Sequence, residues 1–270
     1  MKLALRFFPF LSALLMLGCG GSTTPMTNPL NGNAPTLNGS YSFIAGSQIA
    51  GTNIFTFGGP IQTDASGHVT ANFGVTSVAP TNTCFPAGSA GSFSGTLSPQ
   101  GQLSLSSVAI NGQTISVSAK ISTDGNNFFT GTSSYTISGG CLAGDHGSLF
   151  VSRLLTGQFT GSFLTTGGLV GVTVNFGQPG MPNADTSFPL IGTATFTNTA
   201  GCGGFTTATS TSGAEPGLQA AFTMATNLAA NTISFLGTTE DAAGEQFSGS
   251  FTITGGPCDG SHGQVTLNRM

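Results

Sequence analysis

The chain has 270 residues, of which only 5% are charged: Lys and Arg together number 5, against 9 for Asp and Glu. Past residue 36 there are three basic residues, Lys120, Arg153 and Arg269. Nucleic acids and anionic lipid surfaces are bound through several Lys and Arg side chains, so this composition excludes both as electrostatic partners. The polar surface must come mainly from Ser, Thr, Asn, Gln and Gly, which suits an extracytoplasmic β-protein.

The N-terminus has the pattern of an export signal. Two basic residues precede an apolar run, residues 7–17, which is shorter than the roughly 20 residues of a membrane-spanning helix. The run ends in Met16-Leu17-Gly18-Cys19, which resembles the lipobox of bacterial lipoproteins, with Met16 where the family usually has Leu or another aliphatic residue. The resemblance implies that residues 1–18 are released as a signal peptide and that Cys19 is acylated. The alternative is an ordinary secretory signal with an incidental cysteine.

Residues 19–36 are expected to form a lipidated tether. The stretch after Cys19 is rich in Gly, Pro, Asn, Ser and Thr and has no hydrophobic period, which is typical of a flexible chain about 20–25 Å from end to end. Gly20, rather than Asp, follows Cys19, and by resemblance to lipoprotein sorting this is compatible with delivery to an outer membrane. We therefore expect an exported protein that is lipid-anchored to the bacterial cell envelope, at an outer membrane or the cell surface.

The rest of the chain is a duplication. Residues 138–153, SGGCLAGDHGSLFVSR, return as residues 254–269, TGGPCDGSHGQVTLNR, and the Gly-x-His-Gly and final Arg fall 116 residues apart. Two β-domains are therefore predicted, residues 37–154 and 155–270, each long enough for a core of its own. Since no Gly/Pro-rich linker separates them, we expect the angle between them to be restricted.

The repeat also selects the disulfides. Beyond Cys19 the chain has four cysteines, which allow three pairings. The duplication favours one disulfide in each domain, Cys84 with Cys141 and Cys202 with Cys258, each worth roughly 4 kcal/mol in the chain-entropy model. An export compartment permits this oxidation. A four-cysteine zinc site is the alternative, and the lack of any Cys-x-x-Cys pair argues against it.

Secondary structure is predicted to be almost wholly β. Apolar and polar residues alternate, as in strands with one buried face, at residues 69–73, 115–121, 172–176 and 233–235. Turn sequences stand between such stretches, at residues 64–67, 99–101, 111–112 and 124–125. The best helix candidate, residues 214–230, is interrupted by Pro216 and further breakers, so no helix is expected there.

Short hairpins in series indicate a meander of about seven to nine strands in each domain. We favour an all-β fold of two tandem antiparallel up-and-down barrels, with a β-sandwich as the alternative. The openings LNGSY (residues 37–41) and LTGQF (residues 155–159) are similar to the first strand of avidin-like and lipocalin-like barrels, which begins Gly-x-Trp; here the tryptophan is absent. That resemblance also implies a barrel.

His146 and His262 are the sharpest candidate site residues, because the duplication kept both. Each could bind a metal or act as a base. The interpretation we favour is that Gly-x-His-Gly is a hairpin turn whose imidazole caps backbone groups, because each His has at most one nearby carboxylate, Asp145 or Asp259. His68 has no counterpart in the second domain. No metal and no cofactor is expected.

Glu240, Asp241 and Glu245 form the one acidic cluster in the sequence. Carboxylates of this kind could hold calcium or serve glycoside hydrolysis. The cluster occurs in one domain only and lacks the EF-hand pattern, so we favour a solvated loop. Motifs of serine hydrolases, P-loops, zinc proteases and dinucleotide-binding folds are absent.

Nineteen of the 22 phenylalanines lie past residue 36 and are expected first in the core, and the lack of Trp with only two Tyr argues against a carbohydrate-binding face. We therefore expect a non-catalytic envelope lipoprotein whose two β-domains contact an unidentified protein or form part of the envelope. One alternative is a carrier of a small apolar ligand, which needs a hollow Phe-lined barrel. The other is a secreted hydrolase, which needs a buried His146 or the acidic cluster beside a cleft.

Overall fold

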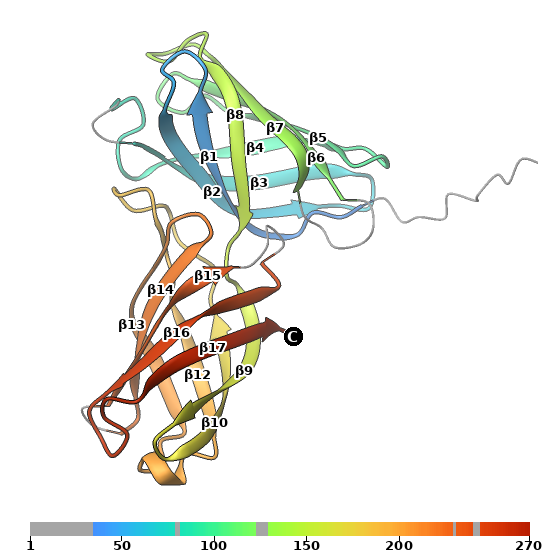
Figure 1. Ribbon diagram of the computed structural model, residues 1–270. Coiled ribbons are helices and arrows are strands. Elements are labelled where there is room, and N and C mark those ends of the chain that lie inside the picture. Colours follow the sequence, from blue (N-terminus) through green and yellow to red (C-terminus); the bar gives the residue numbers. More distant parts are fainter. Residues whose placement is uncertain (1–34, 79–81, 123–128, 229–230, 240–243) are drawn as a thin grey trace, which may run out of the picture. The chain divides into compact units, whose positions relative to one another are not determined.

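The computed structural model describes residues 35–78, 82–122, 129–228, 231–239 and 244–270 (Figure 1). It confirms the all-β prediction and selects the barrel over the sandwich: each repeat folds into a closed antiparallel barrel of eight strands. The compact unit that contains both barrels spans Asn33–Met270. Its described residues include no helix long and apolar enough to cross a bilayer.

The first barrel is a simple meander, shown from blue to green in Figure 1. Its strands are β1 (Gly39–Ser47), β2 (Asn53–Thr63), β3 (His68–Ser77), β4 (Ser89–Leu97), β5 (Gln102–Ser107), β6 (Thr114–Ile121), β7 (Phe129–Ser138) and β8 (His146–Arg153). Each strand pairs with the next, and β1 pairs with β8 to close the ring, with Phe43 opposite Val151.

The second barrel repeats this order with one irregular strand. Its elements are β9 (Gly157–Thr165), β10 (Gly168–Phe176), β11 (Phe188–Pro189), β12 (Gly192–Thr197), β13 (Thr207–Glu215), β14 (Gln219–Thr226), β15 (Thr232–Thr239), β16 (Gln246–Thr254) and β17 (His262–Arg269). The short β11 and then β12 both pair with β13. Together β11 and β12 therefore count as one interrupted strand of the barrel. Pairing of β13 with β14 and of β17 with β9 completes the ring of eight strands.

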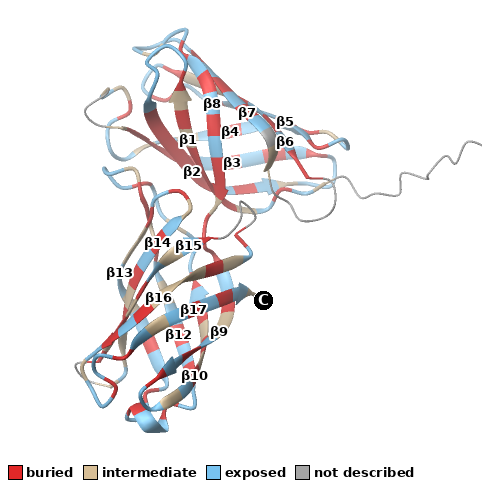
Figure 2. Cartoon of the chain, in the orientation of Figure 1, coloured by how far each residue is buried: buried red, intermediate tan, exposed pale blue. Residues whose placement is uncertain are grey.

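The alternating pattern places large apolar side chains inside each barrel, as the red and pale-blue banding of the strands shows (Figure 2). Aromatic rings stack between neighbouring strands inside the first barrel: the centroids of Phe43 on β1 and Phe57 on β2 lie 4.8 Å apart. In the second barrel the rings of Phe222 and Phe235 lie 4.7 Å apart. These side chains are buried and in mutual contact, so the interiors are packed cores.

Both predicted disulfides are present, Cys84–Cys141 and Cys202–Cys258. The loop that carries each first cysteine also inserts a phenylalanine into its barrel. Phe85 packs 5.2 Å from the ring of Phe55, and Phe205 packs 5.0 Å from the ring of Phe196. Each disulfide therefore fastens the loop with the inserted phenylalanine to the closing hairpin of its own barrel, which is the hairpin of the last two strands, β7–β8 or β16–β17.

Local sequence explains the connections. Residues 64–67, 99–101 and 111–112 are turns between strands, as predicted. Asn111 and Gly112 both have positive φ, 49° and 78°, which is why an Asn-Gly pair suits this tight hairpin. The predicted turn at residues 124–125 lies outside the described residues. A one-turn 3₁₀ helix, Ala200–Cys202, was not predicted.

The outer faces carry many exposed hydroxyl side chains and few charges, together with exposed apolar residues such as Phe150 and Leu236. Ser104, Ser118 and Ser134 are exposed cross-strand neighbours on β5, β6 and β7. On the second barrel Thr195 and Thr207 are exposed neighbours on β12 and β13. Hydrogen bonding to water through hydroxyls therefore takes the place that charges hold on most protein surfaces.

Candidate functional site

Each repeated histidine is the first residue of the last strand of its barrel, directly after a turn: His146 begins β8 and His262 begins β17. Both side chains are exposed. Nδ1 of His146 is 3.1 Å from the carbonyl oxygen of Gly144, and Nδ1 of His262 is 2.9 Å from that of Gly260. This geometry is the one expected for an imidazole that caps its own turn, and neither ring faces a second titratable partner in the described structure.

The residue before each histidine ties the closing hairpin to the first hairpin of the same barrel. Asp145 is 8% exposed and accepts hydrogen bonds from the hydroxyls of Ser47 (2.8 Å) and Tyr135 (2.7 Å). Burial and this contact with Asp145 raise the pKa of Tyr135 well above its usual value. In the second barrel, the hydroxyl of Ser261 instead contacts the backbone N–H and the hydroxyl of Thr166, at 3.2 and 3.1 Å. Two different sets of side chains thus perform the same structural task.

The acidic cluster is only partly described, because Glu240 and Asp241 lie outside the described residues. Glu245 does not stand alone in solvent. Its Oε1 lies 2.8 Å from Nη1 of Arg153 and 3.6 Å from Nε of Arg269. The repeat-ending arginines therefore meet one carboxylate, and two of the three cations beyond residue 36 are at this point.

Arg269 is held by several further contacts. Its guanidinium donates to the carbonyl oxygen of Gly244 from Nε (3.1 Å) and Nη2 (2.9 Å), and to that of Thr156 from Nη1. The guanidinium carbon also lies 4.7 Å from the ring centroid of Phe159. Three of the five N–H donors of this guanidinium are therefore bonded to backbone carbonyls, and its face packs on an aromatic ring, which is the arrangement of a structural clamp.

Glu215 is the buried carboxylate that the sequence did not reveal. It is 1% exposed, at the end of β13, and both oxygens accept from the backbone N–H of Leu155, at 3.0 and 3.3 Å. Burial raises the pKa of Glu215 to about 8, although the Leu155 N–H and the positive charge of Arg269 act in the opposite direction. Its carboxyl group therefore carries a proton at neutral pH.

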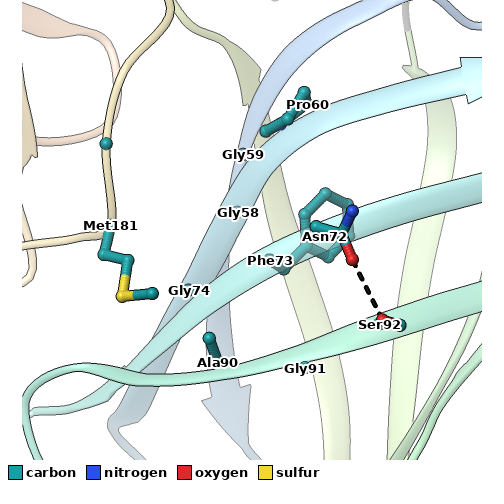
Figure 3. A pocket seen from close by; sticks show the side chains of 11 residues that line it. Gly58, Gly59, Pro60, Asn72, Phe73, Gly74, Ala90, Gly91, Ser92 and Met181 are labelled. Atoms are coloured by element: carbon teal, nitrogen blue, oxygen red, sulfur yellow. Dashed lines mark hydrogen bonds between the residues drawn. The ribbon is translucent and has the colours of Figure 1, made fainter.

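A hollow of about 300 Å³ lies on the outer face of β2, β3 and β4, with Met181 on its far side (Figure 3). Gly58 and Gly74, which are opposite each other on β2 and β3, form much of its floor. A Cβ atom on Gly74 would lie 2.4 Å from Cδ of Pro182, so glycine there permits close approach of the segment before β11. None of the lining residues is charged, and the hydroxyl of Ser92 donates to Oδ1 of Asn72 at 3.0 Å.

A second hollow, of about 390 Å³, is lined by Ile191 and by Gly, Asn, Thr and Ser residues of β10, β12 and β13. It too lacks a charged side chain. Among the described residues no group of three or more His, Cys, Asp or Glu side chains could hold a metal ion. Neither hollow therefore combines a cavity with acid, base or nucleophile chemistry.

The sequence revealed some of the candidate residues but not the contacts that they make. The candidate lipid acceptor Cys19 lies outside the described residues, so its acylation stays a prediction. Arg153 and Arg269 were visible as repeated residues, and only the structure shows that they meet at Glu245. Comparison of the chain with protein-family models, with curated proteins and with solved structures finds no match.

Proposed function

We propose that this protein is a non-catalytic lipoprotein of the bacterial cell envelope, whose two β-barrels act in protein contacts or in envelope structure. The observation that carries the proposal is where the chemically capable side chains lie. His146 and His262 cap turns, Asp145 holds a hairpin, and the arginines clamp a chain junction. These groups support the fold and do not converge on either described hollow.

Export is supported independently by the two disulfides, which are typical of extracytoplasmic proteins. The weakly charged, hydroxyl-rich outer faces fit a protein that works outside the cytoplasm. The lipobox-like Met16-Leu17-Gly18-Cys19 and the tether that follows supply the proposed attachment to the membrane.

The two alternatives receive less support. A carrier of an apolar ligand needs space inside a barrel, whereas the rings of Phe55 on β2 and Tyr135 on β7 meet inside the first barrel with their centroids 5.3 Å apart. A hydrolase needs a base beside a cleft, whereas His146 is exposed at the start of β8. We therefore retain the non-catalytic proposal alone.

Metabolic labelling with palmitate tests the anchor. The wild-type chain is expected to incorporate label and to sediment with membranes, and the Cys19→Ser variant is expected to do neither. Labelling that survives in Cys19→Ser, or an unlabelled wild-type chain in the soluble fraction, would overturn the lipoprotein assignment.

Activity screening tests the non-catalytic part. The purified chain is expected to show no turnover of model esters, glycosides or peptides above that of a matched His146→Ala/His262→Ala variant. Turnover that disappears in this double variant would replace the proposal with the hydrolase alternative.

A further inference from the structure

The link between the two barrels is buried and anchored residue by residue. It consists of Leu154, Leu155 and Thr156, between the end of β8 at Arg153 and the start of β9 at Gly157. All three link residues are buried. Leu154 donates its N–H to the carbonyl oxygen of Ser40 on β1, at 2.9 Å. The link is therefore fixed to the first barrel by a backbone bond that pH does not affect.

The link is fixed to the second barrel by an ionisable group. The N–H of Leu155 donates to the carboxyl group of Glu215, and no other partner of that N–H is described. Two residues after Glu215, the carbonyl oxygen of Gly217 accepts from the hydroxyl of Ser152 at 3.2 Å. The end of β13 and the turn that follows it thus hold both sides of the β8–β9 junction.

The charges around Glu215 come from four elements. Arg269 on β17 is the one whose field acts on Glu215, and burial lowers the pKa of Arg269 itself. Arg153 on β8, Glu245 before β16 and Tyr41 on β1 face Arg269 in turn. The ion pairs described in the structure join both arginines to Glu245, and none includes Glu215. An ionised Glu215 would therefore be a buried charge with only indirect compensation.

We propose that Glu215 is a pH-sensitive latch on the link between the barrels: its protonated carboxyl group keeps Leu155 docked, and loss of the proton favours release of the link. Release exposes Glu215 to water and separates Gly217 from Ser152. The proposal concerns a conformational equilibrium of the folded chain, and it holds whether or not the protein is a lipoprotein.

The pH window follows from the two states of the carboxyl group. In the docked state burial raises the pKa of Glu215 to about 8, and in the released, hydrated state its pKa returns toward 4.5. Release therefore sheds a proton. The equilibrium constant for release rises by roughly tenfold per pH unit between pH 5 and 8 and levels off above pH 8.

Hydrogen exchange of the processed chain tests the proposal. The exchange is measured by mass spectrometry from pH 5 to 9.5 and is corrected for the intrinsic pH dependence of amide exchange. Peptides that cover residues 152–157 are expected to lose protection by about 100-fold or more between pH 5 and 8, and then to reach a plateau. Peptides from β4 to β6 serve as the internal reference and are expected to stay protected.

Two matched variants separate the latch from general destabilisation. Glu215→Gln keeps an acceptor for the Leu155 N–H and cannot ionise, so protection of the link should no longer depend on pH. Glu245→Gln removes a neighbouring carboxylate that is 48% exposed and should keep the wild-type pH response. A wild-type link whose protection is flat with pH, or a response that persists in Glu215→Gln, would overturn the proposal. The wild-type measurement decides the question even if Glu215→Gln fails to fold.

Discussion

Replacing Gln113 by Asn is expected to loosen both cysteine-bearing loops of the first barrel at once. Gln113 is fully buried beside the Cys84–Cys141 disulfide. Its Nε2 donates to the carbonyl oxygen of Cys84 at 3.2 Å, and its Oε1 accepts from the N–H of Leu142 at 3.1 Å. One side chain therefore holds the loop of each cysteine.

Asn is shorter by one methylene, which withdraws the amide by about 1.5 Å and breaks both bonds. Each buried polar group left without a partner costs about 1–3 kcal/mol, and the loops are partly exposed, so we expect a total loss of roughly 2–4 kcal/mol. The second barrel already displays the result. Asn231 is in the equivalent position, packed against Gly256 as Gln113 is against Gly140. Within the described residues, Nδ2 and Oδ1 of Asn231 are buried without a hydrogen-bond partner.

Urea unfolding can measure the effect in one barrel alone, because the two tyrosines of the chain, Tyr41 and Tyr135, both lie in the first barrel. Tyrosine fluorescence should show a lower midpoint for Gln113→Asn, with an unchanged slope. The reciprocal variant Asn231→Gln should leave the tyrosine signal unchanged and stabilise the second barrel, followed by far-UV circular dichroism. A tyrosine-detected change below about 0.5 kcal/mol for Gln113→Asn would refute the role given to this amide.

Three further outcomes are expected. Mild reductant should open Cys84–Cys141 before Cys202–Cys258, because Cys141 is exposed whereas both cysteines of the second pair are buried. Alkylation of the freed thiols followed by mass spectrometry would show the order, and simultaneous reduction of the two disulfides would contradict it. Gly74→Val should destabilise the chain by about 1–3 kcal/mol by displacing Pro182, and an unchanged melting temperature would count against the close contact. The folded chain retains the proton of Glu215 up to about pH 8, whereas the unfolded chain releases it near pH 4.5. The free energy of unfolding should therefore fall by roughly 5 kcal/mol between these two pH values and stay level above pH 8. Glu215→Gln should lack this fall, as measured by urea titrations at each pH.

Much of the fold could be predicted because the signals were local or repeated. Alternation at residues 115–121 marked β6, and the Asn-Gly turn at residues 111–112 marked the hairpin before it. The repeat of Cys141 as Cys258 selected the disulfide pairing that the structure confirms. Residues 214–226 of the one stretch considered for a helix cover the end of β13, a turn with Pro216 and Gly217, and β14.

The junction could not be predicted, because its contacts depend on the closure of two barrels. Nothing in the local sequence of Glu215 distinguishes a buried carboxylate from an exposed one. Its burial results from the docking of Leu155, which lies 60 residues earlier in the chain. The different anchors of the two closing hairpins, Asp145 in one and Ser261 in the other, were hidden for the same reason, since Ser47 and Thr166, which they contact, come from the opposite end of each barrel's sequence.

The position of the two disulfides also decides what a protease can remove. Cys84–Cys141 encloses β4 to β7, and Cys202–Cys258 encloses β13 to β16. A single cut inside either enclosed stretch leaves its two fragments covalently joined, so no part of the chain is shed. A single cut outside these stretches, such as in the segment between β10 and β11, leaves no covalent bond between the two sides of the cut. After a single proteolytic cut, the strands enclosed by each disulfide therefore stay attached through covalent retention of the fragments as well as through folding.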